Sequence, residues 1–223
     1  MKKLIIAAMA LTCATAIVSA ETVTSENIVG YNKAISVSGA SGSGLQLFGI
    51  QFDTAASHTP ESVFGSSLPY GSKVFKYTAP SGPYLISTYM EGVFGDPDGW
   101  NNDFEIGGGI GFWVEIPSGS YTNIISGDVP VSGTVTNSIS AGLQLISYPF
   151  PVVKTVKQLG FTPSYGDKIY KYNAPNGPYT VATYMEGVFG DPDDWNNDFE
   201  IGVGEAFWYE ATSAFSWIVT ENF

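Results

Sequence analysis

One segment of 20 residues occurs twice in this chain, and it constrains the fold more than any other feature of the sequence. Residues 88–107 and 183–202 are the same except that Gly99 in the first copy is Asp194 in the second. A weaker match extends in both directions, so that each unit is about one hundred residues long, a common size for a domain. Internal similarity over this length predicts two homologous modules in tandem.

The first 20 residues are typical of a secretory signal. Lys2 and Lys3 precede an apolar stretch, and Val18-Ser19-Ala20 supplies the small residues that signal peptidase requires. We expect cleavage after Ala20, module 1 at residues 21–127 and module 2 at residues 128–223, in a protein that is secreted, periplasmic or displayed at the cell surface. The alternative, a lipid anchor on Cys13, fits poorly with the preceding threonine. Cleavage removes the one cysteine, which excludes disulfides and cysteine-ligated zinc from the mature chain.

Strand and turn residues dominate each unit. Aromatic residues make up 14% of the chain, and 26 Gly and 13 Pro interrupt it, which favours short strands joined by tight turns. Residues 73–78 and 83–90 flank Ala79-Pro80-Ser81-Gly82 as the strands of a hairpin do, and Thr59-Pro60-Glu61 is typical of a helix start. We expect an all-β fold of two small β-sandwich or partly open barrel modules, each with one short helix.

Two further patterns predict how strands are covered. The runs at 45–52 and 143–150 are almost continuously apolar, which is typical of a strand buried on both faces. Residues 215–219 instead alternate, with Phe215, Trp217 and Val219 on one side. We therefore expect the first two runs in the interior and the last strand at a boundary between core and solvent.

Charge and composition exclude several classes of function. The formal net charge is −12 and all nine basic residues are lysines, so the chain has no basic footprint for nucleic acid. No segment is apolar over the roughly 20 residues of a membrane-spanning helix. His58 has no second histidine near it, and no serine lies in a Gly-x-Ser-x-Gly turn. We assign no catalytic residue and expect a protein that is not an enzyme.

An ordered set of short motifs covers nearly the whole mature chain. In the second copy it reads Lys168-Ile169-Tyr170-Lys171-Tyr172, Gly177-Pro178-Tyr179 and, after Trp195, Gly204-Glu205-Ala206-Phe207-Trp208. The set resembles the repeat of exported tandem-repeat β proteins from planctomycete and verrucomicrobial bacteria, which runs G-x-N-L-I, VYKYN and GEGFFV. The resemblance implies secreted or surface β modules and carries over no catalytic residue. The first copy departs from it where Ile110 takes the place of Glu205.

The repeated segment concentrates the acidic residues, because it contains 11 of the 21 in the chain. Carboxylates and Asn amides in a Pro/Gly turn are ligands that Ca²⁺ prefers, so each module has a candidate calcium loop. The candidate ligands are Asp96, Asp98 and Asp103 in module 1 and Asp191, Asp193 and Asp198 in module 2. The spacing is not that of an EF-hand. The alternative is that these acids start turns and solvate a loop. No other cofactor is expected.

Trp100 and Trp195 lie among these acids and are the candidate ligand-binding residues. An indole face stacks on the C–H groups of a sugar while carboxylates accept hydrogen bonds from its hydroxyls. The alternative is a tryptophan that closes its own module's core. We expect a non-enzymatic component of the cell envelope or extracellular space, with a structural or interaction role and an unidentified protein or glycan partner. The alternatives are a carbohydrate-binding module and a glycan-active enzyme that uses loop carboxylates.

Overall fold

The computed structural model describes residues 28–36, 44–52, 57–128, 132–174, 177–187 and 191–222. The expected signal at residues 1–20, its cleavage site after Ala20 and Cys13 lie outside these residues. The fold is all-β, as predicted, with antiparallel sheets and no closed barrel in the part of the chain described. Within that part no helix has the length and apolar character needed to cross a membrane.

The first half of the chain forms a five-stranded sheet and a separate two-stranded antiparallel sheet. The five-stranded sheet has the order β2-β6-β3-β4-β5, with bounds β2 Gly44–Gly49, β3 Lys73–Tyr77, β4 Tyr84–Met90, β5 Gly99–Trp100 and β6 Gly111–Ile116. The two-stranded sheet pairs β1, Ile28–Ser36, with β7, Ser120–Asp128. Helix α1, Pro60–Phe64, lies between β2 and β3 in the chain.

The second half repeats this plan. Its sheet has the order β9-β15-β11-β12-β13, with bounds β9 Gly142–Ser147, β11 Lys168–Tyr172, β12 Tyr179–Met185, β13 Asp194–Trp195 and β15 Ala206–Ala211. Its two-stranded sheet pairs β8, Ser132–Ile139, with β16, Phe215–Asn222. A further short pair joins β10, Lys154–Thr155, to β14, Glu200–Ile201, and the 3₁₀ helix η1, Val156–Gln158, follows β10.

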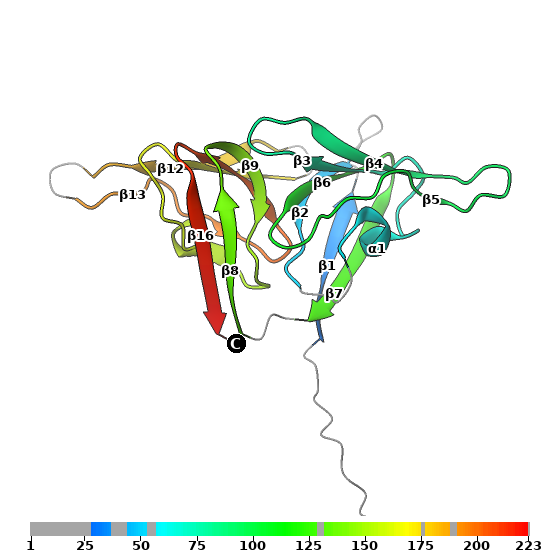
Figure 1. Cartoon of the computed structure of the whole chain (residues 1–223), viewed down its shortest axis with the longest axis horizontal. Helices are drawn as coiled ribbons and strands as arrows, with labels where there is room; N and C mark the ends of the chain where they lie inside the picture. The colour runs from blue at the N-terminus through cyan, green and yellow to red at the C-terminus, as the bar shows by residue number, and fades with distance from the viewer. Residues whose placement is uncertain are drawn as a thin grey trace, which may run out of the picture.

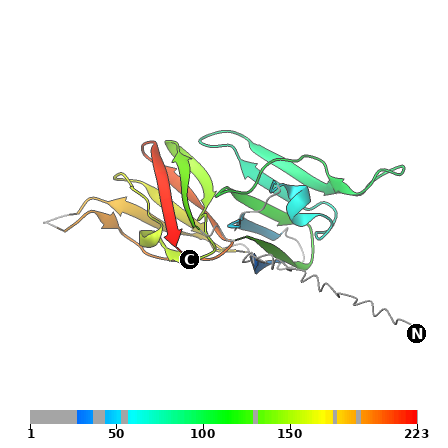
Figure 2. The same ribbon diagram turned by 60° about the horizontal axis from the view of Figure 1, so that its bottom comes forward.

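In each half the two-stranded sheet covers one face of the five-stranded sheet, and a hydrophobic core lies between them. In the first half Ile125 of β7 packs with Phe48 and Phe112 of the sheet. In the second half Trp217 and Val219 of β16 pack with the sheet residues Phe207 and Tyr209. Figure 1 shows the two halves side by side, with β5 and β13 at opposite ends of the long axis, and Figure 2 shows the same arrangement after rotation. Each half is therefore a small, open sandwich.

Each five-stranded sheet has a second face, which points away from its own core, and these two faces pack against each other at the junction between the halves. The buried residues of this junction are Leu47, Trp113, Leu145, Ala206 and Trp208. Two backbone hydrogen bonds cross it, from Gly49 N to Gly204 O at 3.2 Å and from Ser147 N to Gly109 O at 2.9 Å. Because Gly49 corresponds to Ser147 and Gly109 to Gly204 in the repeat, the same bond is made twice. The two halves are thus related by an approximate two-fold axis, as in an isologous dimer.

The helices and turns show where local sequence was a sufficient guide. Thr59 caps α1 by accepting a hydrogen bond from Ser62 N at 3.3 Å, as the Thr-Pro-Glu pattern predicts. The second predicted helix is only the three-residue η1, where Gln158 accepts from Thr155 N at 3.1 Å. The turn between β3 and β4 requires Gly82 because of lack of space, since a Cβ there would lie 2.5 Å from Thr78 O. Its φ is not positive.

Candidate functional site

The acidic segments form the ends of the β4–β5 and β12–β13 hairpins, and their aspartates bond to nearby backbone. Asp98 Oδ1 accepts from Gly92 N at 2.8 Å, and Asp193 Oδ1 accepts from Gly187 N at 2.9 Å. The hydroxyl of Tyr70 also donates to Asp98. These bonds, first that from Tyr70 and then that from Gly92, lower the pKa of Asp98. The repeated Asp therefore closes the same turn in both halves.

The remaining predicted calcium ligands do not converge. Asp198 Oδ1 accepts from Lys157 N at 3.0 Å, while Asp96, Asp103 and Asp191 are exposed at the surface. Among the described residues, no three acidic, histidine or cysteine side chains are grouped so that they could hold a metal ion. The calcium loops predicted from composition thus have no support from this geometry, and the turn-forming alternative accounts for the contacts of Asp98 and Asp193.

The two predicted ligand-binding tryptophans pack inward. Trp195 is 7% exposed and belongs to the core of the second half. Trp100 is half-buried, its Nε1 donates to Gly65 O at 3.0 Å, and its ring lies 5.9 Å from that of Phe64. Neither indole offers the open face that stacking on a sugar needs, and both occupy the positions expected of residues that close a core.

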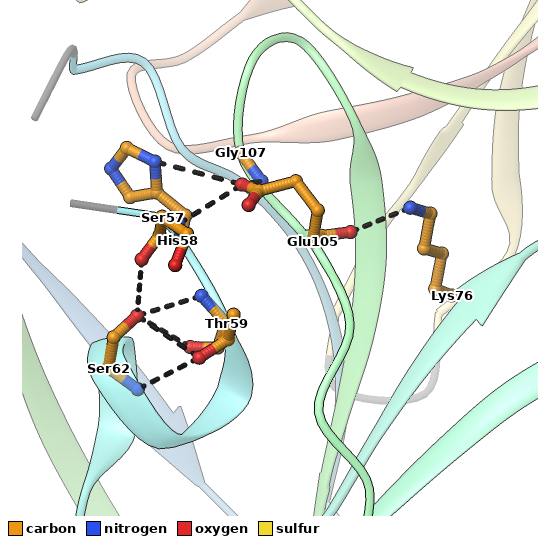
Figure 3. A network of polar contacts seen from close by, with 7 residues as sticks. All are labelled: Ser57, His58, Thr59, Ser62, Lys76, Glu105 and Gly107. Atoms are coloured by element: carbon orange, nitrogen blue, oxygen red, sulfur yellow. Dashed lines mark hydrogen bonds and ion pairs between the residues drawn. The ribbon is translucent and has the colours of Figure 1, made fainter. Parts of the chain in front are cut away.

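His58 belongs to a polar network that joins two loops (Figure 3). Its backbone N donates to Glu105 Oε1 at 3.1 Å, Gly107 N donates to the same oxygen at 3.0 Å, and the ring Nδ1 lies 3.9 Å from it. Lys76 Nζ donates to Glu105 O at 2.7 Å. The hydroxyl of Ser62 donates to Ser57 O at 2.8 Å and not to the imidazole. The network holds the two loops together through Glu105.

A hollow of about 490 Å³ lies on the sheet of the second half, on the face that meets the first half. Its lining consists of Leu143, Tyr170, Tyr179, Trp208 and Glu210, and we call it the Trp208 hollow. Strand pairing brings these residues together, since Tyr170 lies opposite Trp208 and Leu143 opposite Glu210. Residues directly opposite each other point to the same face of a sheet. Trp208 is 7% exposed and Tyr179 is 43% exposed, so Tyr179 is the ring of this lining that a ligand can reach most easily.

The only carboxylate in that lining is held in a defined position. Glu210 Oε2 accepts from Tyr170 OH at 2.5 Å and from Lys168 Nζ at 3.2 Å. The hydrogen bond from Tyr170 is the main cause that lowers the pKa of Glu210, and Lys168 lowers it further. The carboxylate is therefore ionised at neutral pH. With about four acceptor positions, it keeps capacity to accept hydrogen bonds from a ligand.

The first half carries a corresponding surface, formed by Leu45, Phe75, Tyr84, Trp113 and Glu115, which we call the Trp113 face. Here Phe75 replaces Tyr170 and has no hydroxyl. Lys73 Nζ lies 3.6 Å from Glu115 Oε2. Tyr84 is 41% exposed, close to the value for Tyr179. The two surfaces share their apolar residues and differ in one hydroxyl group.

A second, more polar cleft of about 280 Å³ lies between the halves. Gln46 and Leu47 line it from the first half and Lys171, Tyr172, Asn173, Ala174, Glu205 and Ala206 from the second. Lys171 Nζ and Glu205 Oε2 form an ion pair at 2.8 Å, and Gly202 N also donates to Glu205 at 2.8 Å. The charges of this cleft are satisfied by each other and by backbone.

Sequence reasoning did not select the residues of the Trp208 hollow. The available signal was the alternation in 168–172, where Tyr170 and Tyr172 share one face and Ile169 lies on the other. Ile169 is fully buried in the core, so the two tyrosines face away from it. Comparison with protein-family models, with curated proteins and with solved structures finds no match to this chain.

Proposed function

We propose that the protein is an exported, non-enzymatic component of the cell envelope or extracellular space that binds a neutral carbohydrate through the Trp208 hollow. The observation that carries this proposal is a hollow in which the exposed ring of Tyr179 lies beside one positioned carboxylate. Aromatic faces pack on the C–H groups of a sugar, and a carboxylate accepts hydrogen bonds from its hydroxyls. Export rests on the signal expected at residues 1–20.

Charge favours a neutral ligand over an acidic one. Glu210 lies in the hollow, the net charge of the chain is −12, and no arginine is present to pair with a carboxylate or phosphate. An acidic polysaccharide would be repelled by Glu210 and by the field of the whole protein.

Binding is favoured over hydrolysis by the lining of the hollow. Glycosidases use a pair of carboxylates on either side of the bond that they cleave. Among the residues that line the Trp208 hollow, Glu210 is the single carboxylate, and it is already bonded to Tyr170 and Lys168. This arrangement suits a hydrogen-bond acceptor that orients a ligand.

Affinity electrophoresis of the full chain tests the proposal. Gels containing a soluble neutral β-glucan should retard the wild type, and gels containing polygalacturonate should not. Replacing Tyr179 by Ala removes an exposed ring from the hollow and should weaken retention roughly tenfold. Tyr165→Ala is the matched control, because Tyr165 is also exposed but is not part of the lining. Equal retention of the two variants would contradict the proposal.

A further inference from the structure

The aromatic surface does not end with the Trp208 hollow but continues across the junction into the first half. Tyr77 contacts Trp208 with ring centroids 5.0 Å apart, and Trp113 contacts Tyr172 at 4.9 Å. Each of these tyrosines contacts the next ring outward, Tyr77 with Tyr84 at 5.4 Å and Tyr172 with Tyr179 at 5.5 Å. Ring contacts therefore connect the Trp113 face with the Trp208 hollow, with the buried Trp113 and Trp208 in the middle and the exposed Tyr84 and Tyr179 on the outside.

The exposed tyrosines of the two halves lie near each other on this surface. Tyr77 contacts both the Tyr84 ring and the Trp208 ring, and Trp208 lines the hollow together with Tyr179. Both rings remain more than 40% exposed, at 41% and 43%. A ligand seated on Tyr179 in the Trp208 hollow would thus have Tyr84 as the next contact in the direction of the first half.

The approximate two-fold axis has a consequence for a directional ligand. A polysaccharide has a reducing and a non-reducing end, whereas the two halves present their equivalent residues in opposite directions. Two identical halves would accept the chain equally well in either direction. The halves are not identical, because Tyr170 donates to Glu210 at 2.5 Å while Phe75 has no hydroxyl to offer Glu115.

We infer that a single neutral carbohydrate chain binds across both halves in one direction, stacked on the Trp113 face and both stacked and hydrogen-bonded in the Trp208 hollow. This inference rests on the proposed function and adds the extent and polarity of the site. The occupant is a flat chain of equatorial pyranoses, because successive rings of such a chain offer apolar C–H faces to the exposed rings of Tyr84 and Tyr179. Glu115 in the first half and Glu210 in the second oppose an anionic chain.

Titration calorimetry of the full chain with cello-oligosaccharides of two to six sugars tests how far the site extends. We expect affinity to rise at least tenfold from the disaccharide to the hexasaccharide. Tyr84→Ala and Tyr179→Ala form a matched pair of exposed positions. Both should weaken hexasaccharide binding roughly tenfold, and only Tyr179→Ala should weaken disaccharide binding. Each substitution also removes a ring contact with a neighbouring tyrosine, so unfolding curves are recorded and binding is measured where both variants are fully folded.

Polarity is tested with a spin label at the reducing end of the hexasaccharide. It should broaden NMR signals of one half only, and Phe75→Tyr, which supplies the missing hydroxyl, should bring signals of the other half into the broadened set. Affinity that is independent of chain length, or unchanged by Tyr84→Ala, would overturn the extended site but leave the proposed function intact. Broadening of both halves in the wild type would overturn the single direction. No binding at any length would overturn the proposed function as well.

Discussion

Asp167 shows how one residue changes the chemistry of a position that both halves share. It is fully buried and accepts four hydrogen bonds, from Ser164 N at 3.0 Å, Tyr209 OH at 2.7 Å, and the N and Oγ1 of Thr212 at 2.7 Å each. Its counterpart Ser72 is also fully buried, but its hydroxyl has no hydrogen-bond partner among the residues that the structure describes. The partners of Asp167 correspond to Pro69, Val114 and Pro117 in the first half, so the whole network differs together.

Asp167→Ala should lower the free energy of unfolding by about 3 kcal/mol or more, because it removes bonds to a charged acceptor and leaves the Tyr209 hydroxyl buried without a partner. Burial and Asp167 both raise the pKa of Tyr209, so that hydroxyl stays protonated and needs an acceptor. Urea unfolding measures the change. Ser72→Ala is the matched control and should leave stability unchanged or raise it by about 1 kcal/mol, because it removes a buried hydroxyl that has no partner. Equal effects of the two substitutions would show that the network does not stabilise the fold.

The sequence does not reveal this network, for a physical reason. Tyr209 and Thr212 are 42 and 45 residues from Asp167, and only the pairing of β11 with β15 brings them together. Asp167 also lies outside the acid-rich segment that supplied the candidate calcium ligands. Local composition selects exposed acids in turns, whereas a single buried acid leaves no local pattern.

At the scale of elements, alternation was an accurate guide and polar composition was not. Residues 215–219 were predicted to bury Trp217 and Val219, which are 1% and 5% exposed, while Ile218 between them is 56% exposed. β7 and β8 were not predicted as strands because Ser, Thr, Asn and Gly dominate them. Their ladder with a partner strand far along the chain holds them in place, and local propensity does not encode such pairing.

The carboxylate of Glu221 links the C-terminal strand β16 to strand β10 and to Tyr148. Glu221 forms an ion pair with Lys154 of β10 and accepts from Tyr148 OH at 2.6 Å. The bond to Lys154 is the main cause that lowers the pKa of Glu221 below its ordinary value of 4.5, and Tyr148 lowers it further. A carboxyl with a lower pKa in the folded state stabilises the protein above its unfolded pKa, and this contribution is lost as pH falls through the folded pKa.

Glu221→Gln should therefore lower the melting temperature at pH 7, and its effect should shrink as pH falls below 4.5 and through the lowered pKa that Glu221 has in the folded state. The expected loss at neutral pH is roughly 1 kcal/mol, since the pair is only partly buried. Melting temperatures measured from pH 7 to pH 2 check this. Glu91→Gln, at an exposed position, is the control. A constant difference between Glu221→Gln and wild type over the whole range would contradict the assigned role of the charge.

At the scale of the whole molecule, the junction is asymmetric where the two halves come closest. A Cβ on Gly49 would lie 2.1 Å from the Cβ of Ser147, its own counterpart, and a Cβ on Gly111 would lie 2.9 Å from that of Ala206. In each pair the first half supplies the glycine and the second half the side chain. The halves fit each other because they have diverged at these two positions.

Gly49→Ala should cost about 1–3 kcal/mol by overpacking the junction, and adding Ser147→Gly should recover most of that loss. Gly49 lies outside the positive-φ region, so alanine brings no backbone strain there. Urea unfolding of the two single variants and the double variant gives the coupling energy directly. Additive effects of the two substitutions would show that the contact between these positions does not limit the approach of the halves.

The repeat predicted the duplication of the fold, and the apolar runs at 45–52 and 143–150 predicted strands covered on both faces. Leu47 and Leu145 confirm the second point, since they face the other half while their neighbours face a core. That the cover is supplied by the partner half followed from no local pattern. For the same reason the sequence does not single out Trp208, because composition does not distinguish an indole in the core of one half from one at the junction between the halves.

The pairing of β1 with β7 and of β8 with β16 places the two ends of each half next to each other, Ile28 opposite Asp128 and Ser132 opposite Asn222. A pulling force applied through the chain at these ends acts along the ladder hydrogen bonds, which run perpendicular to the strands. The load then falls on one pair of residues at a time, so the two strands separate pair by pair from the loaded end and do not slide past each other. If the protein is tethered by its ends in the envelope, each half yields to tension gradually and lengthens the tether before its sheet is disturbed.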